Sequence, residues 1–187
     1  MIRVGVLALQ GGVALHAKAV EEIGAQAVLV RSAAELRGVE ALVLPGGEST
    51  AQLRLIDSAG LAGPLGEFVA SGRPVFATCA GLILAARHVT DPAQASFGWI
   101  DVTVARNAWG RQVANFEATS DDGAHPLTFI RAPRITAVGP GVEILATFRG
   151  EPVLVRQGNI TGATFHPELT PDRTVHRTAI LTAVGRT

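Results

Sequence analysis

The sequence contains a single cysteine, Cys79, which excludes an internal disulfide. Structural disulfides belong to oxidising compartments, so one unpaired thiol in 187 residues favours a reducing compartment. The chain also runs from Met1 straight into a strand-like segment, without the basic start and long apolar core of a signal peptide. We therefore expect the protein to be cytoplasmic.

An excess of charge of one sign and a long apolar run are also missing. Sixteen basic residues balance sixteen acidic ones, and the basic residues, among which Lys18 is the only lysine, are dispersed. A nucleic-acid-binding face or a polybasic membrane patch needs clustered positive charge, so we expect neither nucleic acid nor membrane as a partner. No apolar stretch approaches the about 18 residues of a membrane-spanning helix. These features predict a single soluble domain, residues 1–187, with a large core.

The first half of the chain alternates buried-type strands with helices. Strands are predicted at residues 2–9, 27–30, 41–44 and 74–78, and helices at residues 13–23, 32–37, 51–57, 64–69 and 80–88. This alternation is typical of a doubly wound α/β fold, in which helices flank a mostly parallel sheet.

The second half changes character. From residue 100 onward, short runs rich in Val, Ile, Thr and Phe are separated by turn signals at residues 107–110, 121–126, 139–141 and 149–150. This pattern predicts antiparallel strands added to one edge of the sheet. A last strand is expected at residues 160–165, followed by a terminal helix that begins at Thr170 or Asp172 and reaches about Val184.

Cys79 lies where one of the predicted strands turns into a helix. Small residues, Ala77, Ala80 and Gly81, surround it, as a tight turn requires because bulky side chains would clash. This is the pattern of a nucleophile elbow, with cysteine in place of serine. The amides and dipole of a helix N-terminus favour a thiolate, so Cys79 is a candidate nucleophile. The alternative is a buried structural cysteine, which is common for a lone cysteine.

His166 and Glu168 end the last predicted strand. Residues two apart on an extended segment project to the same face, and Pro167 between them stiffens the spacing. A carboxylate in that position can orient an imidazole, which in turn takes a proton from a thiol. The alternative is a surface turn. The other histidines, which have no such partner at fixed spacing, are His16, His88, His125 and His176.

Gly46 and Gly47 follow another predicted strand. Their backbone N–H groups are free to point at a developing oxyanion, and Glu48 next to them offers a negative charge for a substrate ammonium. The alternative is an ordinary strand-to-helix loop with Ser49 as the helix cap. The sequence argues against a phosphate loop, because Glu48 stands where that loop has its lysine and would repel phosphate.

Six segments together resemble a known family. They are Leu7-Ala-Leu-Gln-Gly11, Pro45-Gly-Gly-Glu-Ser-Thr50, Thr78-Cys-Ala-Gly81, Arg106-Asn107 with Gly110-Arg-Gln112, Phe129-Ile-Arg131 and Phe165-His-Pro-Glu-Leu169. Together they resemble the glutaminase subunits of pyridoxal 5′-phosphate synthase, a family of triad-type (class I) glutamine amidotransferases. The resemblance implies that L-glutamine is hydrolysed to glutamate and ammonia, without a metal or cofactor, and that the ammonia passes to a separate synthase subunit.

The resemblance also implies residue roles. Cys79 is the nucleophile, His166 its general base and Glu168 the acid that orients the histidine, while the amides of Gly47 and Ala80 form the oxyanion hole. The positions that hold glutamine in the family are Gly47, Glu48, Ser49, Arg106, Ile130 and Arg131.

One position departs from the family pattern, and two other interpretations stay open. Leu15 stands where an acidic residue usually precedes the histidine of the first helix, which concerns the surface that faces the partner. The chain is also similar to the glutaminase of other amidotransferases, such as that of histidine synthesis. A non-catalytic, thiol-bearing binding or stress-response protein of the same architecture would form no thioester and release no glutamate.

Overall fold

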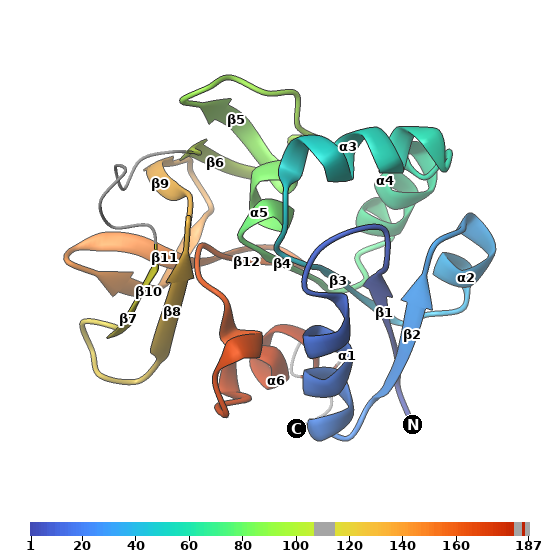
Figure 1. Ribbon diagram of the computed structural model, residues 1–187, viewed down its shortest axis with the longest axis horizontal. Coiled ribbons are helices and arrows are strands. Elements are labelled where there is room, and N and C mark those ends of the chain that lie inside the picture. The colour runs from blue at the N-terminus through green and yellow to red at the C-terminus, as the bar shows by residue number, and fades with distance from the viewer. Residues whose placement is uncertain (107–114, 182–184, 186–187) are drawn as a thin grey trace.

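The computed structural model describes residues 1–106, 115–181 and 185, and a seven-stranded sheet forms its centre (Figure 1). The strand order is β10-β11-β12-β4-β3-β1-β2. The parallel strands are β1 Arg3–Leu7, β2 Gln26–Val30, β3 Ala41–Leu44, β4 Val75–Thr78 and β12 Ile160–Ala163. Two antiparallel strands, β11 Glu151–Gln157 and β10 Glu143–Phe148, extend the sheet beyond β12. The predicted α/β fold, with a mostly parallel sheet and later antiparallel strands, is confirmed.

Helices cover both faces of this sheet. Figure 1 shows α1 Val13–Glu22 and α6 Thr174–Ile180 on one face, and α3 Ser49–Ser58, α4 Ala62–Ala70 and α5 Ala80–Ala85 on the other, with α2 Ala33–Arg37 beyond β2. Strand β3 is buried on both sides. Leu42 and Leu44 join the core under α3 to α5, whereas Ala41 and Val43 join the core under α1 and α6. The alternation follows from the two-residue period of a strand.

The remaining strands form two smaller sheets. Strands β5 Ala86–Thr90, β6 Ile100–Ala105 and β9 Arg134–Val138 make one, and β7 Asn115–Thr119 and β8 Pro126–Ile130 make a hairpin. The predicted antiparallel pairing is confirmed for β6 with β9 and for β7 with β8, but the prediction that these four strands extend one edge of the central sheet is wrong. Strand β5 falls at the end of a predicted helix and pairs parallel to β6. The hairpin docks through the packing of Phe129 against Phe148 and Phe165, and through a backbone hydrogen bond from the His166 N–H to the Thr128 carbonyl at 2.8 Å.

The helix predicted at residues 80–88 is shorter than expected. Helix α5 ends at Ala85, and the chain continues as β5. The amides of Phe97 and Trp99 donate to the carbonyls of Leu84 and Ala85, so residues outside the helix take up its last carbonyl groups. This long-range pairing ends the helix where the local sequence has no breaker.

The chain closes with two short elements after β12. A 3-10 turn, η1, spans Pro167–Leu169, and α6 begins at Thr174, whose backbone N–H donates to Asp172 Oδ1 at 2.9 Å. Val184, the expected end of the helix, lies outside the described residues. None of the described helices is long and apolar enough to span a membrane.

Candidate active site

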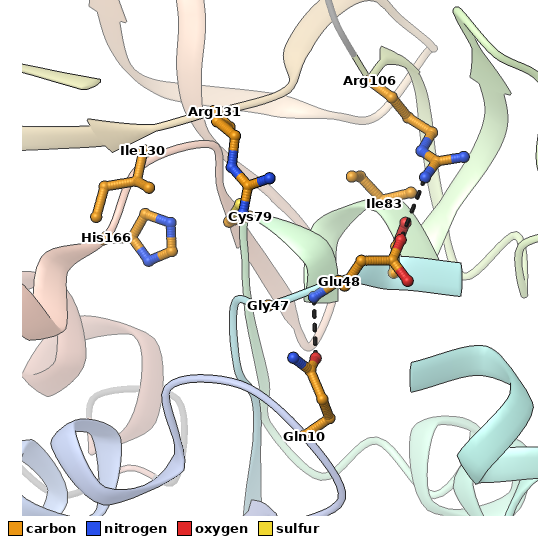
Figure 2. Close-up of a pocket in the computed structure, with 10 residues that line it drawn as sticks. Gln10, Gly47, Glu48, Cys79, Ile83, Arg106, Ile130, Arg131 and His166 are labelled. Atoms are coloured by element: carbon orange, nitrogen blue, oxygen red, sulfur yellow. Dashed lines mark hydrogen bonds and ion pairs between the residues drawn. The ribbon is translucent and has the colours of Figure 1, made fainter. Parts of the chain in front are cut away.

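Four loops converge at one edge of the central sheet, where the parallel strands β12, β4, β3 and β1 have their carboxyl ends. This edge is the usual ligand site of open α/β sheets. The loops enclose a pocket of about 260 Å³ (Figure 2). Its lining residues are Gln10, Gly47, Glu48, Ser49, Cys79, Ile83, Arg106, Ile130, Arg131 and His166. The structure therefore brings together all the residues expected to hold glutamine.

Cys79 sits at the junction of β4 and α5, as the sequence predicts. Its backbone has φ 47° and ψ −104°, a conformation that costs a residue other than glycine about 1–3 kcal/mol. Hydrogen bonds hold it on both sides: its N–H donates to the Ala163 carbonyl at 2.8 Å, and its carbonyl accepts from the Ile83 N–H at 3.1 Å. A Cβ at Gly81 would collide with the Leu44 carbonyl oxygen, so the elbow also requires glycine there.

His166 and Glu168 form a buried pair beside this elbow. His166 Nδ1 lies 2.7 Å from Glu168 Oε1. Within the described parts of the chain, His166 Nε2 makes no hydrogen bond. Gly46 leaves room for the imidazole, because a Cβ at that position would come within 3.1 Å of His166 Nδ1. The ring is thus anchored through one nitrogen, and the other is available for a proton transfer.

The electrostatics of the pair favour a charged imidazole. Burial lowers the pKa of His166, but Cys79 and Glu168 favour the imidazolium more strongly and raise that pKa from 6.5 to about 10. Burial acts on Glu168 in the opposite sense, yet the hydrogen bond from His166 keeps the pKa of Glu168 below its usual 4.5. At neutral pH an imidazolium therefore lies between a carboxylate and the cysteine.

Glu48 has two sets of partners. Its carboxylate caps α3 by accepting from the Thr50 N–H at 3.0 Å and the Ala51 N–H at 2.7 Å. Arg106 Nη2 lies 3.4 Å from Glu48 Oε1, as the dashed line in Figure 2 shows. The alternative that Ser49 caps this helix is wrong. The Ser49 hydroxyl donates instead to Gln94 Oε1 at 2.8 Å.

Two arginines line the pocket with Glu48. Arg106 follows β6, and Arg131 follows Ile130 at the end of β8 with φ 44°. Backbone hydrogen bonds to Thr50 and Ala51 offset the effect of burial and lower the pKa of Glu48, so it stays ionised at neutral pH. One anionic and two cationic side chains suit a small zwitterion that carries both an ammonium and a carboxylate.

The loop of Gly46 and Gly47 is fixed by the turn that follows β1. The Gly46 carbonyl accepts from the Gly12 N–H at 3.0 Å. Gln10 Oε1 accepts from the Glu48 N–H at 2.9 Å, and a Cβ at Gly47 would collide with that oxygen. The close approach of the two loops therefore requires glycine at Gly47.

Sequence reasoning missed several residues of the site. Gln10 and Ile83 line the pocket, and a search of the residues after each parallel strand would have found Gln10. His16 and His176, which have no partner at a fixed sequence spacing, find theirs in the fold: His16 Nε2 lies 3.3 Å from Glu168 Oε2, and His16 Nδ1 lies 3.1 Å from His176 Nε2. Neither contact has a sequence spacing that could reveal it.

Three expectations remain, which concern a metal site, the family segment at residues 107–112, and Ala80. In the described ranges, no group of three or more His, Cys, Asp or Glu side chains could hold a metal ion. Asn107 and the segment Gly110-Arg-Gln112, which form part of the family resemblance, lie outside the described residues. Ala80 is fully buried behind the pocket as the first residue of α5.

Known proteins are similar to this chain in sequence and in fold. Residues 6–184 match the SNO glutamine amidotransferase family. The chain is 50% identical over 182 residues to the pyridoxal 5′-phosphate synthase subunit PdxT of Desulforudis audaxviator (strain MP104C), covering 95% of this chain and 96% of that protein. It is 48% identical to the subunit of the same name from Geobacillus stearothermophilus, with 91% and 89% covered. A crystal structure of a glutamine amidotransferase superposes with a TM-score of 0.90 at 42% identity, covering 97% of this chain and 98% of that one.

Proposed function

The chain belongs to the SNO glutamine amidotransferase family, and from this we propose that it is the glutaminase subunit of a pyridoxal 5′-phosphate synthase. It hydrolyses L-glutamine to L-glutamate and ammonia, and a separate synthase subunit uses the ammonia. The observation that carries the proposal is the placement of Cys79 at a strand-to-helix elbow, in one pocket with His166 and with Glu48, Arg106 and Arg131.

In the first half of the proposed reaction, the Cys79 thiolate attacks the side-chain amide carbon of glutamine. The carbonyl oxygen becomes an oxyanion, for which the amides of Gly47 and Ala80 are the proposed donors. His166 then gives its proton to the amide nitrogen, the C–N bond breaks, and ammonia leaves. Carbon and sulfur remain joined in a thioester.

In the second half, the now neutral His166 takes a proton from water, and the resulting hydroxide attacks the thioester. The C–S bond breaks, the new γ-carboxyl group of glutamate gives up its proton to water, and Cys79 and His166 are released for another cycle. Glu168 stays ionised throughout and stabilises the imidazolium through the 2.7 Å contact at Nδ1.

Substrate selection follows from the position of the charges relative to sulfur. The ammonium and carboxylate of glutamine would bind Glu48 and one of the two arginines, with Ser49 and Ile130 completing the pocket wall. Asparagine carries the same charges, but its amide is one methylene closer to them. Fixed charges therefore place the glutamine amide, and not that of asparagine, at Cys79.

The synthase partner is part of the proposal, because the relatives at 48–50% identity are named as subunits of a synthase. Ammonia released into neutral water becomes protonated and loses the lone pair that makes it a nucleophile. We also propose that the protein is cytoplasmic, because a free thiol stays reduced there. Residues 1–187 would form a single domain, and no nucleic acid would be a partner.

These same relatives favour this function over the glutaminase of histidine synthesis. A non-catalytic binding protein would not need a buried His166 with a free Nε2 beside a cysteine. The test is glutamate release from glutamine by the full chain, with and without the synthase subunit, and with Cys79→Ala as the control. Release by the Cys79→Ala variant, or none by the native chain in the complex, contradicts the proposal.

A further inference from the structure

His16 lies in α1 with its ring fully buried behind the His166 and Glu168 pair. Its Nε2 lies 3.3 Å from Glu168 Oε2 and 3.1 Å from Thr78 Oγ1. On its other side, Nδ1 lies 3.1 Å from Nε2 of His176, which α6 brings to the same place. Two helices that cover one face of the sheet thus place two imidazoles in line with the carboxylate of the site.

Glu168 needs this contact because its side chain is only 2% exposed. A buried carboxylate without donors is costly, and Oε1 is already used by His166. Within the described residues Oε2 makes no regular hydrogen bond, and His16 Nε2, which is hydrogen-bonded to Thr78 Oγ1 at 3.1 Å, lies 3.3 Å from it. Whatever orients the second oxygen must act from the side of His16.

The two buried histidines are neutral at pH 7. Burial lowers the pKa of His16 to about 4 and that of His176 to about 3. Each neutral ring has one N–H, so the hydrogen bond between the two rings can be donated either by His176 to His16 or by His16 to His176. If His176 Nε2–H donates to His16 Nδ1, then His16 Nε2–H faces both Thr78 Oγ1 and Glu168 Oε2. The opposite direction would set a nitrogen lone pair against a carboxylate oxygen, which is repulsive.

We propose that His16, with its proton kept on Nε2 by His176, is a positioning residue that holds the Glu168 carboxylate in the orientation that meets His166 Nδ1. Removing the donor lets the carboxylate rotate away from His166, whose imidazolium then loses its anchor. This inference rests on the proposed glutaminase function and adds two residues to its machinery.

A neutral donor fits this position better than a cation. The charged and titratable groups that act on His16 are Glu168, His166 and Arg173, and Asp172 acts on His176. Arginine or lysine in place of His16 would pair with Glu168 and weaken its attraction for the His166 imidazolium. A neutral N–H orients the carboxylate and leaves its full charge for His166.

The test compares three variants of the full chain, assayed with the synthase subunit. His16→Leu removes the donor, and His16→Gln keeps an N–H group near the Nε2 position. We expect His16→Leu to lower kcat roughly 10- to 100-fold with KM for glutamine nearly unchanged, because His16 does not line the pocket. His16→Gln should recover most of the loss. Val20→Ala, which removes buried volume from the same helix, should lower Tm without this kinetic change.

A pH profile separates positioning from packing. An N–H group beside a carboxylate favours its ionised form, so losing His16 should raise the pKa of Glu168, move the acid limb of kcat/KM to higher pH in His16→Leu, and return it in His16→Gln. Unchanged kcat and acid limb in a folded His16→Leu, or a His16→Gln no better than His16→Leu, would overturn the inference.

A spectroscopic signature keeps the inference testable if His16→Leu does not fold. The Nδ1 proton of His166, bonded to Glu168, should give a downfield NMR resonance, and His176→Phe should shift it by freeing the His16 tautomer. An unshifted resonance contradicts the inference. This readout needs no turnover, whereas failure of the native complex to release glutamate would count against the proposed function alone.

Discussion

His166 Nδ1 lies 2.7 Å from Glu168 Oε1, and both groups are buried below the sulfur-bearing elbow of Cys79. Cys79 and Glu168 together raise the pKa of His166 against the effect of burial, so the imidazolium is its favoured form. His166 therefore already carries the proton that the leaving ammonia needs, and the Glu168 carboxylate compensates the charge of the imidazolium.

The first prediction removes that compensation. Glu168→Gln keeps the size of the side chain but loses the negative charge, so the imidazolium is less stable. We expect kcat to fall about 10²- to 10⁴-fold, with little change in KM because Glu168 does not line the pocket. Steady-state glutamate release measures both constants. A variant with the native rate would remove Glu168 from the mechanism.

A second prediction concerns stability against pH. The folded-state pKa values of His16 and His176, about 4 and 3, lie below the ordinary 6.5, so below pH 6.5 the unfolded chain binds protons that the folded chain does not. The free energy of unfolding should fall as pH drops from about 6.5 to 5, by about 1–2 kcal/mol per histidine. His166, with its pKa raised to about 10, acts with the opposite sign and contributes stability that is lost only as pH rises toward that value.

Urea unfolding at both pH values measures this effect. His176→Phe removes one of the two histidines that bind a proton in the unfolded but not in the folded chain. The variant should therefore lose less unfolding free energy than the native chain between the same two pH values. Equal losses in the native chain and the variant would show that His176 is not the source.

The third prediction separates two roles of Glu48. Glu48→Gln keeps an oxygen that can cap α3 but loses the charge for the substrate ammonium, so KM for glutamine should rise with little loss of stability. Glu48→Ala should also lose the cap and cost about 1 kcal/mol of unfolding free energy. Glu35→Gln is the matched control, because Glu35 accepts the hydroxyl of the α2 cap Ser32 at 3.0 Å and does not line the pocket. A normal KM with a lowered kcat in Glu48→Gln would instead place Glu48 in transition-state stabilisation.

The fourth prediction concerns control by the synthase. The Gly46 carbonyl accepts from the Gly12 N–H at 3.0 Å, and the N–H of Gly47 points to the opposite side of the same peptide. We expect a partner that presses on the Gln10 turn to break this bond and rotate the peptide, so that the Gly47 N–H turns toward the oxyanion position. One donor is worth roughly 2.7–4 kcal/mol, so kcat should rise 10²- to 10³-fold as the synthase is titrated. A kcat that stays flat through saturation of the complex rules out this gate.

Local pattern was enough to predict the parallel strands and the elbow. Residues 41–44 were predicted as a strand with the bounds that the structure has, because a strand buried on both faces is apolar throughout. Cys79 and His166 could be assigned to one site from the sequence, because both follow such strands and the carboxyl ends of neighbouring parallel strands lie at one edge of the sheet.

The errors share one physical cause, which is contact between residues far apart in the chain. The end of α5 depends on amides of Phe97 and Trp99, and the place of the β7 and β8 hairpin depends on aromatic packing. His16 and His176 are 160 residues apart and meet only because both helices cover one face of the sheet. A spacing rule within one segment cannot detect such a contact.

The most direct test of the account is covalent labelling of the native complex with a glutamine analogue that carries an electrophilic carbon in place of the amide. We predict one label per chain, located on Cys79 by peptide mass spectrometry, with loss of glutamate release in proportion to the labelled fraction. Glutamine should protect against the label, and Cys79→Ala should take up none. A label on another residue, or full glutamate release by the fully labelled protein, would contradict the assignment of Cys79 as the nucleophile.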